Sequence, residues 1–276
     1  MKFSNCIPLR IHCWGGLGSQ LYALSTAYDL KIKYPKRKIK MVLHTGGVTK
    51  RLSELEFIHN IDFDIIQVND FRNQDKEFKT QIELNKTRLR RFLTTILYFF
   101  NFVVSANSDL EFDKVRPWTF STRGHYFNRK VSSNFYSYLL EYLDIKKKPL
   151  NRSRFELAIH YRMGDLLSLS TKSITPANKI IDIIIQIKKV SKNLHINVYS
   201  DSPRIAKETL IQAGLTDGFQ VKDLPTIDVI RACIEADYFI GTGSKVSLWI
   251  VNIRRYSGEI THNYLEGFDD KLFELP

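Results

Sequence analysis

The sequence predicts an α/β fold built as two Rossmann-like domains, over residues 1–150 and 151–276. Short apolar segments typical of strands alternate along the chain with segments of helical periodicity. The alternation occurs in both halves, and a basic, proline-containing link at 146–151 separates them. Loops after several of the expected strands carry Gly, Ser, Asp or Arg, which is typical of the carboxyl edge of a parallel sheet.

In the first half, an expected strand from Pro8 to Trp14 leads into a glycine turn at 15–18. A helix follows, with apolar residues near helical spacing until Pro35 ends it. A second strand is expected from Lys38 to His44, which completes a strand–loop–helix–strand unit of a parallel sheet. The mixed, charged and Phe-rich stretch at 51–121 predicts helices more than strands.

The second half shows the same alternation more clearly. Strands are expected at Phe155–Tyr161, Leu194–Tyr199 and Asp237–Ile240, and helices at Ile180–Val190, Ile205–Ala213, Thr226–Glu235 and Val246–Ile253. Successive parallel units of this kind predict a second Rossmann-like domain.

The composition is that of an ordinary folded protein except for its charge. With 43% apolar residues, a chain of 276 residues can bury a core without disulfides or a structural metal. Its 41 Lys and Arg against 29 Asp and Glu give a net charge of +12, which favours nucleic acid, phosphorylated ligands or an acidic membrane as partners. The three cysteines form no CxxC pair and no signal peptide is expected, so a reducing cytoplasm is the predicted location.

The segment Phe92–Ala106 is apolar and aromatic, and a basic run at 86–91 precedes it. It is too short to span a bilayer, which requires about 20 apolar residues. Two interpretations remain open. One is a buried helix, and the other is a basic, aromatic face that rests on the anionic cytoplasmic leaflet.

Four polar loops follow expected strands, at 15–20, 160–165, 199–202 and 241–247. Turn and helix-cap chemistry explains any one of them. Together they predict an anionic ligand between the two domains, because such ligands bind beyond the carboxyl ends of parallel strands. The glycine turn lacks the third glycine of the dinucleotide fingerprint and no Walker sequence is present, so neither NAD nor an ATPase is indicated.

The second loop carries Arg162 directly after a strand, where a guanidinium binds two phosphate oxygens at once. Asp165 is placed to orient that arginine or to reach a sugar hydroxyl, and His160 is either a packed core residue or a proton shuttle. The small hydroxyls of Ser244 and Ser247 suit a diphosphate, and Asp201 suits the base or ribose of a nucleotide.

No metal site is expected. Asp62 and Asp64 form an Asp-x-Asp pattern, which points to a metal-dependent nucleotide-sugar site. They lie in an alternating stretch, however, which favours two exposed carboxylates on one strand face. His and Cys show no zinc-ligand spacing.

In their order along the chain, these motifs resemble those of the bacterial alpha-1,2-fucosyltransferases (glycosyltransferase family 11). More distantly, they resemble other GDP-fucose-dependent transferases with two Rossmann domains. Gly15–Tyr22 is similar to the family's GGLGNQ turn and the helix after it, with Ser in place of Asn. His160, Arg162 and Asp165 match its H-x-R-R-x-D motif, in which Met163 stands at the second arginine.

Two later segments extend the resemblance: 200–202 is similar to a Ser-Asp-Asp strand end, and 243–249 to a loop that enters a helix. The resemblance implies a GT-B fold, in which two Rossmann-like domains face a central cleft. It also implies an inverting, metal-independent transfer of L-fucose from GDP-fucose to a glycan hydroxyl in an alpha-1,2-linkage. The implied setting is the synthesis of bacterial surface polysaccharide, either O-antigen or capsule.

By the same resemblance, Arg162 grips the donor diphosphate, and Met163 leaves one fixed charge fewer on the phosphates. The catalytic set is Arg162, Asp165 and His160, and the base for the acceptor hydroxyl is either Asp165 or His12. The expected ligand-binding residues are Gly16, Gly18 and Gln20 on the acceptor side, with Arg162, Asp201, Ser244 and Ser247 on the donor side. No cofactor is expected, since the GDP-sugar is the donor substrate.

Other functions remain open beside this one. The donor could be another GDP-deoxysugar such as GDP-colitose, or the chain could be a basic nucleic-acid-binding or non-catalytic glycan-binding protein. No RNP-type motif, zinc finger or helix-turn-helix pattern supports nucleic acid, so it is not an expected partner. The expected partners are a GDP-sugar, a glycan acceptor that is lipid-linked or free, and an anionic membrane at the inner face of the cytoplasmic membrane.

Overall fold

The computed structural model describes residues 7–45, 52–58, 63–68, 88–145, 155–164, 167, 174–258 and 262–265. The chain divides into two compact units, Met1–Tyr138 with Pro276 and Leu139–Leu275. Each unit contains a five-stranded sheet, and every strand pair in both sheets is parallel. The predicted α/β class with two successive sheets is therefore confirmed. The expected link at 146–151 lies outside the described residues, and the expected cleft between the domains stays a prediction.

The sheet of the first unit has the strand order β3-β2-β1-β5-β4. Its elements are β1 (Leu9–Trp14), α1 (Leu17–Lys33), β2 (Ile39–His44), β3 (Asp64–Val68), α3 (Arg88–Phe99), β4 (Val103–Ser105), α4 (Asp109–Phe112), β5 (Ser121–Arg123) and the start of α5 (Ser133–Leu143). The expected strands and helix at the start of the chain are confirmed. The stretch at 51–121 holds the two edge strands, β3 and β4, besides its helices. In the described part of this stretch, α3 and α4 hold 12 and 4 residues and β3 and β4 hold 5 and 3, so helix exceeds strand as the sequence predicted. The short edge strands carry little periodicity.

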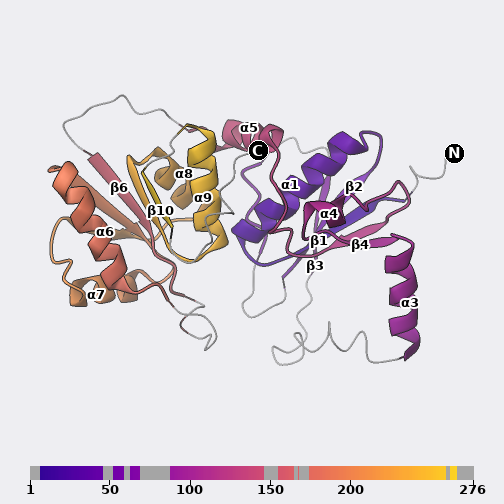
Figure 1. The fold of residues 1–276 in the computed structure, drawn as a ribbon, viewed down its shortest axis with the longest axis horizontal. Coiled ribbons are helices and arrows are strands. Elements are labelled where there is room, and N and C mark those ends of the chain that lie inside the picture. Colours follow the sequence, from indigo (N-terminus) through magenta and orange to yellow (C-terminus); the bar gives the residue numbers. More distant parts are fainter. Residues whose placement is uncertain are drawn as a thin grey trace. The chain divides into compact units, whose positions relative to one another are not determined.

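The second unit has the strand order β10-β9-β6-β7-β8. Its elements are β6 (Phe155–His160), α6 (Ala177–Val190), β7 (Leu194–Tyr199), α7 (Pro203–Gln212), β8 (Phe219–Lys222), α8 (Thr226–Glu235), β9 (Tyr238–Gly241), α9 (Lys245–Tyr256) and β10 (Asn263–Leu265). Figure 1 shows α6 and α7 on one face of this sheet and α8 and α9 on the other. The α6/α7 face holds a continuous core that includes Leu157, Ile159, Ile180 and Leu210, each at most 1% exposed.

The apolar segment Phe92–Ala106 is divided between two elements. Its first part ends α3, and its last part forms β4, where Val103 and Val104 are buried. The helix is not buried, since Phe92 is 62% and Phe99 is 77% exposed. A single buried helix is therefore the wrong interpretation of this segment. Among the helices in the described ranges, none is long and apolar enough to cross a membrane.

Candidate functional site

The carboxyl ends of three neighbouring strands meet in the second unit. His160, the last residue of β6, pairs with Tyr199 at the end of β7 and with Gly241 at the end of β9. The loops that follow these strands therefore lie side by side, at the edge of a parallel sheet where ligands bind. Three of the four polar loops are brought together in this way.

The backbone of Arg162 is fixed where β6 ends. Its amide donates to Oγ1 of Thr242 at 3.0 Å, and that hydroxyl donates to the carbonyl of His160 at 3.1 Å. The amide of Thr242 also donates to the carbonyl of His160, at 3.1 Å. Thr242 thus locks the start of the loop to the neighbouring strand, which restricts where the half-buried guanidinium of Arg162 can reach.

Asp201 fixes the next two residues of the same loop. Its Oδ1 accepts hydrogen bonds from the amides of Met163 and Gly164, both at 2.9 Å. A Cβ on Gly164 would lie 2.5 Å from Oδ2 of Asp201, so this close approach requires glycine. The carboxylate expected to hold a nucleotide is therefore engaged in positioning the loop that carries Arg162.

The side chains of this loop alternate between the core and the site. Tyr161 and Met163 are 1% and 2% exposed and belong to the hydrophobic core, while Arg162 between them is only half-buried. The position that holds the second arginine of the similar motif therefore faces apolar residues in this chain. A methionine suits that environment, because burying an unpaired charge is costly.

His160 lies in a hydrogen-bonded cluster with two serines. Its Nδ1 is 2.7 Å from Oγ of Ser247, and Oγ of Ser244 is 3.1 Å from the same hydroxyl. Ser244 also caps α9, since its Oγ accepts from the amide of Ser247 at 3.0 Å. Both serines are almost completely buried, so their hydroxyls act on His160 and on the helix. The sequence had assigned them to a ligand.

The charge state of His160 follows from its surroundings. Burial lowers its pKa to about 4; Asp201 opposes this shift and Arg162 adds to it. The imidazole is therefore neutral near pH 7. A neutral ring bonded through Nδ1 to Ser247 suits a fixed donor or acceptor better than it suits a proton shuttle.

In the first unit, the glycine turn is closed by the chain's own side chains. Gln20 is 1% exposed, and its Nε2 donates to the carbonyls of Gly15 at 3.1 Å and Leu52 at 2.8 Å. Oε1 of Glu54 accepts from the amide of Leu17 at 3.0 Å, so a carboxylate already occupies the N-terminus of α1. Glu54 had no signal in the sequence, because it meets the turn only through tertiary contact.

Three rings gather at the carboxyl ends of β1 and β2. Trp14 and His44 are stacked, with centroids 4.3 Å apart and an interplanar angle of 7°. Nδ1 of His12 is 2.8 Å from Nε2 of His44, so one of the two imidazoles donates a hydrogen bond to the other. All three rings are half-buried. The sequence had singled out His12 alone, although strand pairing aligns Trp14 with His44.

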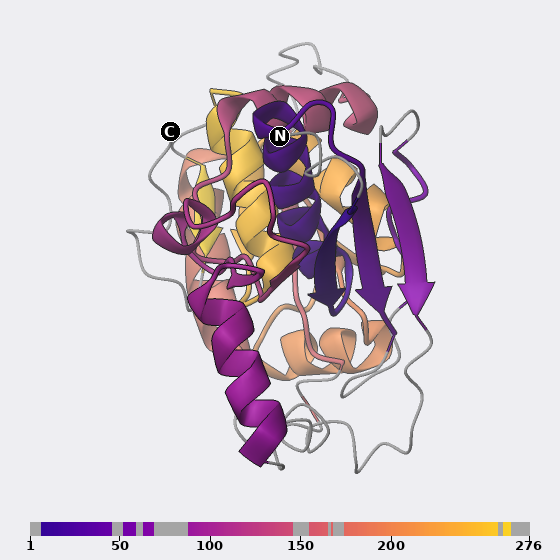
Figure 2. The same cartoon turned by 90° about the vertical axis from the view of Figure 1, so that its right-hand side faces the viewer.

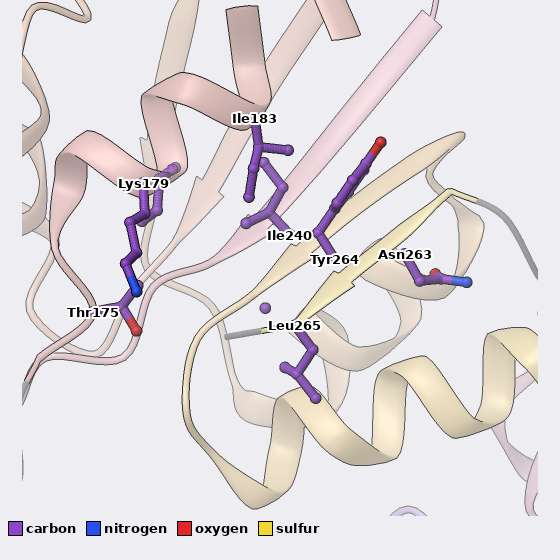
Figure 3. Close-up of a pocket in the computed structure, with 9 residues that line it drawn as sticks. Thr175, Lys179, Ile183, Ile240, Asn263, Tyr264 and Leu265 are labelled. Carbon is purple, nitrogen blue, oxygen red and sulfur yellow. The ribbon is translucent and has the colours of Figure 1, made fainter. Parts of the chain in front are cut away.

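A cavity of about 230 Å³ lies at the ends of β9 and β10 (Figure 3). Aliphatic side chains and the ring of Tyr264 line one part of it. Thr175, which precedes α6, and Lys179 in the first turn of α6 line another. Gly241 contributes to its wall, and it pairs with His160. The cavity therefore adjoins the sheet edge that carries Arg162, on the α6 side.

The sequence also singled out Asp165 as a catalytic residue and Asp62 and Asp64 as an Asp-x-Asp pattern. Asp165 and Asp62 lie outside the described residues. Asp64 is exposed and forms ion pairs with Lys38 at 3.2 Å and Lys40 at 3.6 Å, and its hydrogen bond with Lys38 lowers its pKa. Within the described part of the chain, no group of three or more His, Cys, Asp or Glu side chains could hold a metal ion.

No family model and no curated protein matches the chain. Among solved structures, similar ones include a glycosyl transferase family 9 protein from Veillonella parvula DSM 2008, with 10% identity and a TM-score of 0.46 over 90% of this chain and 79% of that one. The S. aureus MnaA–UDP co-structure has 9% identity and a TM-score of 0.48 over 97% and 86%. A glycosyltransferase from Rickettsia africae ESF-5 has 14% identity and a TM-score of 0.37 over 94% and 84%. At these values the function has to be argued from this chain's own residues.

Proposed function

We propose that the chain is an inverting, metal-independent glycosyltransferase that moves L-fucose from GDP-fucose to a glycan hydroxyl. One observation carries the proposal. Arg162 stands where three parallel strands end, and Thr242 and Asp201 fix the backbone of Arg162 and of the two residues after it. GDP and the alpha-1,2-linkage come from the resemblance of the loop motifs.

The chemistry follows from the charge of the leaving group. The acceptor oxygen attacks the anomeric carbon, the bond from that carbon to the diphosphate breaks, and its electron pair leaves with GDP. A fixed guanidinium at the diphosphate stabilises this growing negative charge, which is the role a metal ion has in other transferases. The neutral ring of His160 adds a hydrogen-bonding group of fixed orientation without adding charge.

The acceptor side belongs to the first unit in this proposal. The attacking hydroxyl must lose its proton, and His12, paired with His44, is the group assigned to accept it. The proton is added at Nε2 of His12, while Nδ1–H donates a hydrogen bond to Nε2 of His44 at 2.8 Å and so stabilises the imidazolium. The stacked ring of Trp14 offers an apolar face of the kind that packs against sugars.

The deciding experiment is turnover of a panel of nucleotide sugars, with GDP release as the readout. We expect Arg162→Ala to abolish transfer and to retain the wild-type circular dichroism and melting temperature. Arg204→Ala is the matched control, because that side chain is 88% exposed on α7 of the same unit. Wild-type turnover by folded Arg162→Ala would remove the proposal's main support.

The donor panel also separates the alternatives. Turnover of GDP-colitose and not of GDP-fucose would show that the donor is GDP-colitose, and the proposed role of Arg162 would be unchanged. Thermal stabilisation by oligonucleotides and not by GDP would favour a nucleic-acid-binding protein. The proposal places the enzyme at the inner face of the cytoplasmic membrane, in contact with anionic lipid.

A further inference from the structure

An exposed aromatic surface covers α3 and the turn after it. Phe92, Phe99 and Phe100 are 62%, 77% and 54% exposed, and Leu93 is 50% exposed. Figures 1 and 2 both show α3 extending from the β4 edge of the first unit, away from its sheet. Single exposed apolar residues are common on proteins, but a contiguous set marks an interaction surface.

The contacts make the set contiguous. The rings of Phe99 and Phe100 meet edge to face at 5.1 Å, and the ring of Phe102 follows at 6.4 Å from Phe100. Nε1 of Trp118 donates to the carbonyl of Phe100 at 2.9 Å, which holds an indole that is 52% exposed beside these rings. We call Phe99, Phe100, Phe102 and Trp118 the α3 aromatic surface, and Phe92 is exposed earlier on the same helix.

The sequence on both sides of this surface is rich in basic residues. From Leu84 to Ser108 the sequence contains Lys86, Arg88, Arg90 and Arg91 and no Asp or Glu. The helix begins at Arg88, so its first turn is basic. Lys114 and Arg116 are exposed near Trp118, and two exposed carboxylates, Asp109 and Asp113, precede them. Asp109 lies 3.7 Å from the guanidinium of Arg129.

We propose that the α3 aromatic surface docks the protein on an anionic phospholipid bilayer. Aromatic side chains, and Trp above all, favour the boundary between headgroups and acyl chains. Lys114 and Arg116 beside Trp118 favour acidic headgroups, as does the basic sequence from which α3 begins, so the two features select the same partner. The inference rests on the proposed function only for its biological setting. The inference identifies α3 and the turn after it as the part of the protein that contacts the membrane. It also gives the depth of the contact, since the aromatic rings insert shallowly and no helix spans the bilayer.

The test is flotation of the full chain with phosphatidylcholine vesicles that contain or lack phosphatidylglycerol. We expect binding to the anionic vesicles alone, weakened by salt. Phe99→Ser should lower the partition coefficient about tenfold, since one ring loses its burial in the membrane. Val190→Ser, in a side chain that is 75% exposed on α6, is the matched control and should bind as the wild type does.

A spectroscopic arm locates the contact. Of the three tryptophans, Trp249 is fully buried and Trp14 is half-buried, so Trp118 should dominate a blue shift on vesicle binding. Trp118→Phe should remove most of the shift while the protein still floats. Equal binding to neutral vesicles, or wild-type flotation by Phe99→Ser, would overturn the proposal. So would a dimer that Phe99→Ser dissociates without any change in flotation.

Nucleotide-sugar turnover, measured with the same protein variants, tests the transferase proposal separately. Phe99→Ser should retain GDP release with a soluble acceptor, because the residue lies outside the site. Loss of flotation with retained turnover would support both proposals. Flotation of the wild type without any nucleotide-sugar turnover would support docking and remove the proposed activity.

Discussion

Oδ1 of Asp201 lies 2.9 Å from the backbone nitrogen of Gly164, and the carboxylate holds the turn that follows β6. The same oxygen accepts from Met163 at 2.9 Å. A single side chain on β7's loop thereby sets the path of the β6 loop, and with it the position of Arg162. This contact links folding to the proposed donor site.

The contact predicts a coupled effect on stability. Asp201→Ala should lower the free energy of unfolding by about 2 kcal/mol, because two amides lose their acceptor. Gly164→Ala should also destabilise, since its Cβ would lie 2.5 Å from Oδ2 of Asp201. In the double variant the clash disappears. Its loss of unfolding free energy should therefore be about 1 kcal/mol smaller than the sum of the losses in the two single variants. Urea unfolding measures all three, with the exposed Asp217→Ala as the control. Strict additivity would show that the two residues do not interact.

His160 predicts a pH dependence. In the unfolded chain the imidazole is protonated below its usual pKa of 6.5. In the folded protein its pKa is about 4, so it stays neutral until the pH falls to that value. Stability from this group is therefore complete above pH 6.5 and is lost as the pH falls between these values, by about 1.4 kcal/mol per unit. In His160→Asn that component of the slope should be missing, while Nδ2 keeps a partner for Ser247. Unfolding free energies over this range test it, and parallel slopes in the two proteins would contradict the lowered pKa.

Glu54 predicts a helix-capping effect. Glu54→Ala should cost about 1 kcal/mol of stability, because the amide of Leu17 and the N-terminus of α1 lose their carboxylate. Glu54→Gln keeps an acceptor oxygen and should cost less. Glu56 is exposed two residues further on, and Glu56→Ala serves as the control. If both alanine variants unfold at the same urea concentration, the contact contributes no stability.

The His12–His44 pair predicts a separation of two activities. With glutamine at His12, transfer to the acceptor should fall about 100-fold or more, because the hydroxyl loses its general base. Slow release of GDP in the absence of acceptor should remain, since Arg162 is untouched. His195→Gln, on β7, is the control and should transfer normally. A parallel loss of both activities would assign His12 to the fold or to the donor site instead.

The sequence was informative wherever periodicity and loop composition are local properties. Alternating apolar runs predicted β6, β7 and β9 almost to the residue, and parallel pairing then requires their loops to meet. The edge strand β4 was missed, since it has only three residues. The alternation around Asp64 did indicate a strand, and β3 begins at that residue. The sequence also left open whether Phe92–Ala106 is buried or exposed, because an apolar helix has the same sequence pattern in both cases.

The sequence by itself determined that this chain forms parallel α/β sheets and that Arg162 follows a buried strand. Only the tertiary structure decided which polar groups remain for a ligand. Asp201, Ser247 and Gln20 were all expected to bind a ligand, but each forms a hydrogen bond within the protein. The partners are Met163, His160 and Leu52, which lie 38, 87 and 32 residues away along the chain. Such pairings depend on how distant segments pack, because a hydrogen bond requires two groups within about 3 Å and sequence spacing does not give that distance. The same reason applies to Met163, because the sequence alone does not show that its side chain is buried in the core while that of Arg162 beside it is half-buried.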